Sequence, residues 1–179
     1  MLLLHLEEIK SMCFSTTASF AAATVLGGIG ILSLKKTSKP EHIPFAAIPL
    51  VFATQQLFEG FVWLGLLHKI PQNYSDMAVN AFLFFAMVVW PLWVPTAMML
   101  IEKNEKRKRI LKVMLIIGII VSLLSLVYLF TRDSIASINP YHIHYELEVN
   151  YTLKICLGVL YLFPTILAQI LSSNKTIVW

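Results

Sequence analysis

Long apolar runs constrain the fold of this chain more than any other feature of its sequence. Of its 179 residues, 58% are hydrophobic and only 13% are charged, against about 25% charged in an average soluble domain. An apolar run of about 20 residues lets a helix cross a bilayer, where only helices and closed barrels satisfy their backbone groups. The hydropathy predicts five such helices, at residues 14–34, 44–67, 77–101, 110–130 and 152–171. We therefore expect an all-α polytopic transmembrane helix bundle, with residues 12–179 as its single domain.

The basic residues between the runs predict an orientation. Ten of the 14 lysines and arginines lie in or beside the first and third connections or after the fifth run, and four lie on the opposite side. The positive-inside rule then places the amino terminus outside and the carboxyl terminus in the cytoplasm, and we expect a bacterial plasma membrane. This clustering accounts for the net charge of +4, and because no nucleic-acid motif is present we expect no nucleic-acid partner.

The lipid bilayer is the predicted partner, and one basic run favours a particular lipid. Lys103 to Arg109 could bind anionic lipid heads, at about 1 kcal/mol for each basic residue near the surface. The alternative is that this run only fixes the orientation of the chain. The sequence predicts no oligomeric state.

Glu59 is the only charged residue in the run 44–67. An ionisable side chain inside a membrane costs about 2.5 to 3.5 kcal/mol on insertion scales, so it normally faces protein or water and has a partner. At helical spacing Gln55, Glu59 and Trp63 share one face, and Gln56 lies within one turn of Glu59. We interpret these four residues as a candidate ligand-binding site. The alternative is that they tie helices together, as polar residues often do in membranes.

The connection at residues 131–151 carries a second constellation. Polar and apolar residues alternate after Pro140, so in an extended segment the polar side chains line one face and the apolar ones the other. The polar face consists of residue types that bind metals, namely His142, His144, Glu146 and Glu148. Two histidines at this spacing are weak evidence for a metal without a third ligand.

The predicted topology supplies further ligands. It places Glu59 about 12 Å from the outer end of its helix, on the same side as the histidine connection and as Cys13. We therefore predict that His142, His144 and Glu59 bind a ligand or a divalent metal, with Cys13 as a further ligand candidate. The alternative is that both histidines are solvated residues of a loop.

Two prolines interrupt the third run. Pro91 and Pro95 each remove a backbone hydrogen bond and free the carbonyl four residues back, those of Met87 and Pro91. We expect a kink at this point. Freed carbonyls can bind a cation or line a cavity, but neighbouring helices and hydroxyl groups often satisfy them, and we favour that structural interpretation.

Several motifs resemble a family of uncharacterised multi-pass membrane proteins, a domain-of-unknown-function family. Its members open Met-Cys-Phe-Ser-x-x-Ala-Ser-Phe, and residues 12–20 read MCFSTTASF. The blocks at 48–63, IPLVFATQQLFEGFVW, and at 89–95, VWPLWVP, are also similar, as is HIHY at 142–145. The resemblance implies that residues 1–11 are an extension, and that relatives continue beyond Trp179 with further helices, so that this chain is truncated. It implies no activity.

The sequence leaves four classes of function open. We favour a membrane protein that binds a ligand or a metal through Glu59 and the His142/His144 connection. The alternatives are a small transporter or an ion- or proton-binding protein that uses Glu59, a membrane-embedded hydrolase, and a structural or sensory module. No serine, carboxylate and histidine set matches a membrane hydrolase, and no internal repeat supports a transporter.

Overall fold

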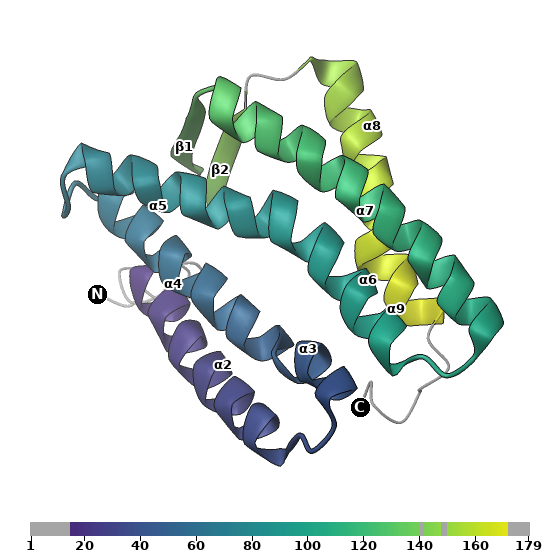
Figure 1. Ribbon diagram of the computed structural model, residues 1–179. Helices are drawn as coiled ribbons and strands as arrows, with labels where there is room; N and C mark the ends of the chain where they lie inside the picture. Colours follow the sequence, from purple (N-terminus) through teal and green to yellow (C-terminus); the bar gives the residue numbers. More distant parts are fainter. Residues whose placement is uncertain (1–14, 140–141, 148–149, 172–179) are drawn as a thin grey trace, which may run out of the picture.

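The computed structural model describes residues 15–139, 142–147 and 150–171, which form long helices and one small sheet (Figure 1). The elements follow in this order: α2 (Thr16–Lys36), η1 (Pro40–His42), α3 (Ile43–Ala46), α4 (Ile48–Leu66), α5 (Gln72–Phe84), η2 (Phe85–Val89), α6 (Trp90–Ile101), α7 (Glu105–Thr131), β1 (Ser134–Asn139), β2 (His142–Leu147), α8 (Tyr151–Leu162), η3 (Phe163–Leu167) and α9 (Ala168–Leu171). Of the three η segments, η1 is a 3₁₀ turn, and η2 and η3 are π turns.

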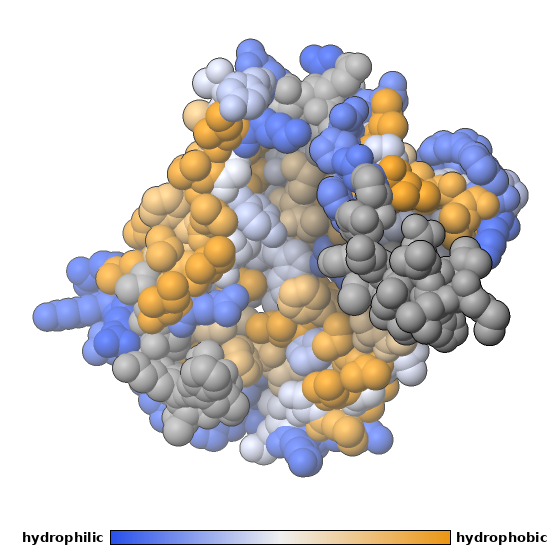
Figure 2. Space-filling view, turned by 180° about the vertical axis from the view of Figure 1, so that it is seen from behind, coloured by the Kyte–Doolittle hydropathy of each residue, from blue (hydrophilic) through white to orange (hydrophobic). Residues whose placement is uncertain are grey.

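Five helical segments are long and apolar enough to cross a membrane. They span Thr16–Lys36, Pro40–Leu66, Gln72–Ile101, Glu105–Thr131 and Tyr151–Ile170. Each overlaps one of the five predicted runs, so the prediction of an all-α bundle with five such helices is confirmed. Hydrophobic side chains accordingly cover much of the face seen in Figure 2, and hydrophilic ones gather toward its margins.

The fourth helix begins within the basic run, at Glu105 rather than at residue 110. The reason is a cap at Asn104, whose side-chain oxygen accepts hydrogen bonds from the backbone N–H groups of Lys106 and Arg107, at 3.0 and 3.2 Å. Asparagine at this position satisfies donors that the first helical turn leaves unpaired. The cap therefore extends the helix into residues that hydropathy alone assigns to the connection.

The helices pack in the order of the chain. α2 lies along α4, α4 along α5, and α6 along α7, and the segment α8–η3–α9 packs against α6 and α7 (Figure 1). Glycines permit the close approach of α2 to α4: a Cβ on Gly30 would meet Leu50, and one on Gly60 would meet the ring of Phe20. Because these two helices run antiparallel, Thr16, one turn before Phe20, lies at the level of Trp63.

The third long helix is interrupted as its prolines predict. The π turn η2 ends at Val89, two residues before Pro91. Side-chain hydroxyls satisfy carbonyls in this turn: Tyr161 donates to the oxygen of Ala86 and Ser122 to that of Val88, both at 2.8 Å. α-Helical spacing predicts free carbonyls at Met87 and Pro91. The π turn moves the first of these to Ala86, five residues before Pro91, whereas Pro95 lies inside the α-helix α6, where the predicted spacing holds. The hydroxyl bonds support the structural interpretation of the kink.

The long fourth connection folds into an antiparallel hairpin. Strands β1 and β2 pair so that Ser137 faces His144 and Ala136 faces Tyr145. β1 packs against α4 and α5. We call this end of the bundle the hairpin end: α4 and α7 finish there, and α5 and α8 begin there (Figure 1).

Candidate functional site

Glu59 lies half-buried in α4 and forms a hydrogen bond within its own helix. The side-chain amide of Gln56 donates to a carboxylate oxygen of Glu59 at 2.6 Å. The two residues are three apart, which places them side by side on a helix surface. No basic residue of the described chain pairs with Glu59, so its polar partner there is a neutral amide.

Gln55, one turn before Glu59 on α4, bonds to α6 and not to this pair. Its side chain is 8% exposed, and its oxygen accepts a hydrogen bond from the indole nitrogen of Trp90 at 2.5 Å. Consecutive residues of an α-helix point about 100° apart, so adjacent glutamines meet different neighbours. The polar stripe predicted from the sequence is therefore divided between two places in the structure, one at Glu59 and one at Trp90.

Tyr145 of β2 comes from the hairpin to the neighbourhood of Glu59. Its ring stacks on that of Phe82 in α5, and its hydroxyl is buried without a hydrogen-bond partner among the described residues. Burial, and to a lesser degree the charge of the Glu59 carboxylate, raises the pKa of Tyr145. Sequence reasoning placed Tyr145 on the apolar face of the strand and did not single it out. The alternation does contain a signal for Tyr145, because the apolar face of a strand is the face that packs against the helices.

The two histidines do not join Glu59. His142 and His144 lie on the strand face opposite Tyr145, and the ring of His144 is 3.2 Å from a carboxylate oxygen of Glu146. The apolar face packs on the helices and so turns the polar face away from them. Among the described residues, no three His, Cys, Asp or Glu side chains are grouped so that they could hold a metal ion. The set of His142, His144 and Glu59 is thus not assembled, and Cys13 and Glu148 lie outside the described residues.

Trp63 lies one turn beyond Glu59 on the same face of α4. It is 7% exposed, and its indole N–H has no acceptor in the part of the chain that the structure describes. The hydroxyl of Thr16, at the same level on α2, is also buried without a partner there. Buried polar groups are nearly always hydrogen-bonded, so each buried group without a partner needs an explanation. The three groups without a partner, on Trp63, Thr16 and Tyr145, all lie at the hairpin end, on α4, α2 and β2.

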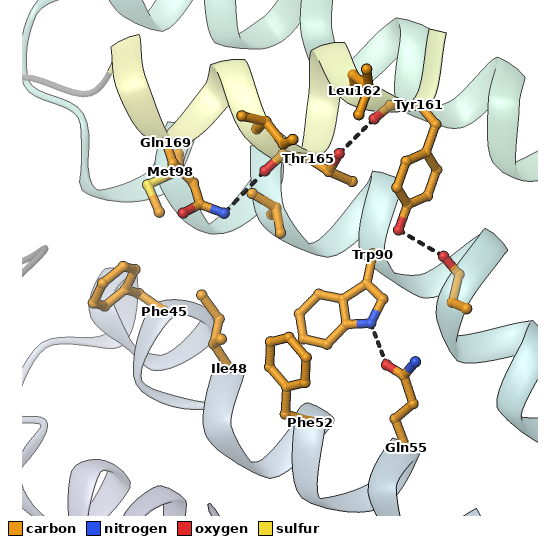
Figure 3. Close-up of a pocket in the computed structure, with 13 residues that line it drawn as sticks. Phe45, Ile48, Phe52, Gln55, Trp90, Met98, Tyr161, Leu162, Thr165 and Gln169 are labelled. Carbon is orange, nitrogen blue, oxygen red and sulfur yellow. Dashed lines mark hydrogen bonds between the residues drawn. The ribbon is translucent and has the colours of Figure 1, made fainter. Parts of the chain in front are cut away.

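A cavity of about 590 Å³ lies beside Gln55, between α4, α6 and the segment from Tyr161 to Gln169. Figure 3 shows Gln55 and Phe52 on one wall, Trp90 beside them, and Tyr161, Thr165 and Gln169 on the opposite wall. Its volume is within the usual range for small-molecule sites, about 300 to 1,000 Å³.

Comparisons with known proteins identify one family. A family model described as "Family of unknown function (DUF6629)" matches residues 12–179. No curated protein and no solved structure matches the chain. The match begins at Met12, where the resemblance in the sequence also begins.

Proposed function

Since this chain belongs to DUF6629, a family of unknown function, we propose a function from its own geometry: it is an integral membrane protein that binds a proton, or a small cation that competes with one, at Glu59. The observation that carries the proposal is the polar surroundings of Glu59. Within the described chain its hydrogen-bond partner is the neutral amide of Gln56, and no basic side chain balances its charge.

A carboxylate in such a place has two accessible forms. An uncompensated charge inside a membrane is costly, so uptake of a proton or a cation stabilises the site. The buried N–H of Trp63 and the hydroxyl of Tyr145 are donors without acceptors in the described chain. Both are donors of the kind that stabilises a charged carboxylate. A site that exchanges a proton must stabilise Glu59 both with and without the proton. A permanent link between helices needs to stabilise only one of these two forms.

The proposed orientation follows from the charge distribution. With the amino terminus outside, the hairpin end faces the exterior and Glu59 lies in the outer half of the bundle. The basic run Lys103 to Arg109 then faces the cytoplasm, where anionic lipid heads are its proposed contact.

The substitution Glu59→Gln tests the proposal in cells. Glutamine keeps the size and hydrogen-bonding capacity of the side chain but cannot exchange a proton. The test needs a strain in which deletion of the gene causes a measurable phenotype. In that strain the Glu59→Gln protein should be made at normal levels but should not reverse the phenotype. A matched control is Glu41→Gln, the same substitution at an exposed glutamate, which should reverse it. Full rescue by Glu59→Gln would leave only the structural role.

A further inference from the structure

None of the described residues that line the cavity beside Trp90 is charged. It is formed by apolar and aromatic side chains with a few neutral polar ones: Phe45, Ile48, Phe52, Gln55, Ala86, Trp90, Val94, Met98, Tyr161, Leu162, Thr165, Ile166 and Gln169. A charged ligand would lose its hydration here without an opposite charge to compensate. The lining therefore selects a neutral ligand.

Gln55 lines this cavity and keeps a hydrogen-bond donor beyond its bond to Trp90. The indole nitrogen of Trp90 can only donate, so the hydrogen bond of 2.5 Å between the two side chains fixes the oxygen of the Gln55 amide toward Trp90. The amide nitrogen, with two N–H groups, is left for another partner. No described residue accepts a hydrogen bond from it, although Gln55 itself is 8% exposed.

The polar groups of the opposite wall are already engaged. Tyr161 donates to the carbonyl of Ala86 at 2.8 Å, Thr165 to that of Tyr161 at 2.6 Å, and the amide of Gln169 to that of Thr165 at 3.0 Å. These bonds use the two hydroxyl donors of the wall and one of the two N–H groups of Gln169. Gln55 keeps both N–H groups of its amide, and it lies beside the rings of Phe52 and Trp90, so we take it as the donor for a ligand at that end.

The two ends of the cavity differ in chemistry. At the Gln55 end, the rings of Phe52 and Trp90 lie 4.2 Å apart between centroids (Figure 3). Eight residues along α6 from Trp90, about 12 Å away, the lining is mostly apolar, with Met98 and with Phe45 and Ile48 of the facing segment. Gln169 lies beside Met98 with its amide bonded to Thr165 (Figure 3). One end thus suits a planar ring that accepts a hydrogen bond, and the other suits a hydrocarbon chain.

We propose that this cavity binds a neutral, lipid-soluble carbonyl compound of the quinone type, with a ring carbonyl accepting a hydrogen bond from Gln55 and the tail lying toward Phe45. The site is separate from Glu59 and requires neither a proton nor a cation there. An ester lipid also carries a carbonyl group, but it lacks the planar ring that the pair of Phe52 and Trp90 fits.

Three probes of similar size, added to the purified full-length protein, distinguish a quinone-type ligand from an ester lipid and from a hydrocarbon. They are a decyl-substituted benzoquinone, a fatty acid methyl ester, and an alkylbenzene without oxygen. Binding of the benzoquinone is measured by quenching of tryptophan fluorescence, and the other two by competition with it. The benzoquinone should bind about tenfold more tightly than the alkylbenzene, the margin of one hydrogen bond, and more tightly than the ester, which lacks the planar ring. Displacement by the ester at equal concentration would assign the site to ester lipids instead, and equal affinity of all three would overturn the role of Gln55.

Substitutions locate the binding on Gln55. Gln55→Met keeps the length of the side chain and removes its donors, so benzoquinone affinity should fall about tenfold while that of the alkylbenzene is unchanged. Gln72→Met, at an exposed glutamine of α5 outside the cavity, is the matched control and should bind as the wild type does. Trp90→Phe keeps an aromatic wall but releases the Gln55 amide, and it should also weaken benzoquinone binding. Wild-type affinity in both Gln55→Met and Trp90→Phe would contradict the proposal.

Discussion

The ring of Tyr145 stacks on that of Phe82, with centroids 4.7 Å apart and planes 12° from parallel. This contact joins the hairpin to α5 and decides which face of β2 meets the helices. Because side chains alternate along a strand, the same contact turns the hydroxyl of Tyr145 inward and His142 and His144 outward. The hairpin therefore contributes a phenol to the surroundings of Glu59, and no imidazole.

The stack should matter more for stability than the hydroxyl does. Tyr145→Ala removes a large aromatic contact and should lower the free energy of unfolding by about 2 kcal/mol. Tyr145→Phe keeps the ring and removes a buried hydroxyl without a partner in the described chain, so stability should be unchanged or slightly higher. Thermal unfolding in detergent measures both. Equal losses in the two variants would show that the hydroxyl has a stabilising partner.

Tyr145 also predicts sensitivity to alkali. Burial raises its pKa in the folded protein above the ordinary value of 10.0. Above about pH 10 the folded state therefore holds a proton that the unfolded state releases, and stability falls as the pH rises. Unfolding followed from neutral to alkaline pH should show a smaller fall in Tyr145→Phe than in the wild type. Identical falls would contradict the burial of this hydroxyl.

Two glycines test the packing of α7 on α6. A Cβ on Gly118 would collide with the carbonyl oxygen of Pro91, whereas a Cβ on Gly28 would meet nothing within 4 Å. Both lie inside helices, where alanine is favoured by about 1 kcal/mol, so Gly28→Ala should be neutral or stabilising and Gly118→Ala destabilising. Melting temperatures in the same detergent provide the comparison. A stable Gly118→Ala protein would mean that α6 and α7 are further apart.

The histidines should be dispensable for the site at Glu59. Replacing both His142 and His144 by alanine leaves the inward face of β2 intact. The labelling of Glu59 by a carboxyl-specific reagent should therefore not change. Elemental analysis after purification in a mild detergent tests the separate prediction of a metal. A bound divalent metal that disappears in the double variant would support that prediction, with a third ligand from residues outside those described.

The orientation of the chain can be tested with topology reporters. Fusions after Lys39 and Lys106 should report the cytoplasm, and fusions after Asn73 and Ser137 the exterior. The opposite pattern at all four positions would place the hairpin end and Glu59 toward the cytoplasm.

Much of the fold could be predicted from the sequence, because the length of an apolar run and the alternation along a strand are local properties. The surroundings of Glu59 could not. Whether Gln55 or Gln56 bonds to the carboxylate depends on how α4 is rotated about its axis relative to α6. The hydrogen bond from the Trp90 indole to Gln55 leaves Gln56 as the partner of Glu59, and this contact between helices is not visible in the sequence. In β2 the alternation is evident from the sequence, but it does not tell which of the two faces packs beside Glu59; the structure shows that the face with Tyr145 does.

The reactivity of Glu59 toward dicyclohexylcarbodiimide tests the central claim most directly. This apolar reagent adds to protonated carboxyl groups in apolar surroundings, and mass spectrometry of the peptide that contains Glu59 measures the product. If Glu59 exchanges a proton, labelling should be strong at acidic pH, decline as the pH rises, and be absent from Glu59→Gln. Protection by sodium or potassium ions at constant pH would identify a competing cation. Labelling that does not depend on pH, or no labelling anywhere in the range where the protein stays folded, would contradict the account.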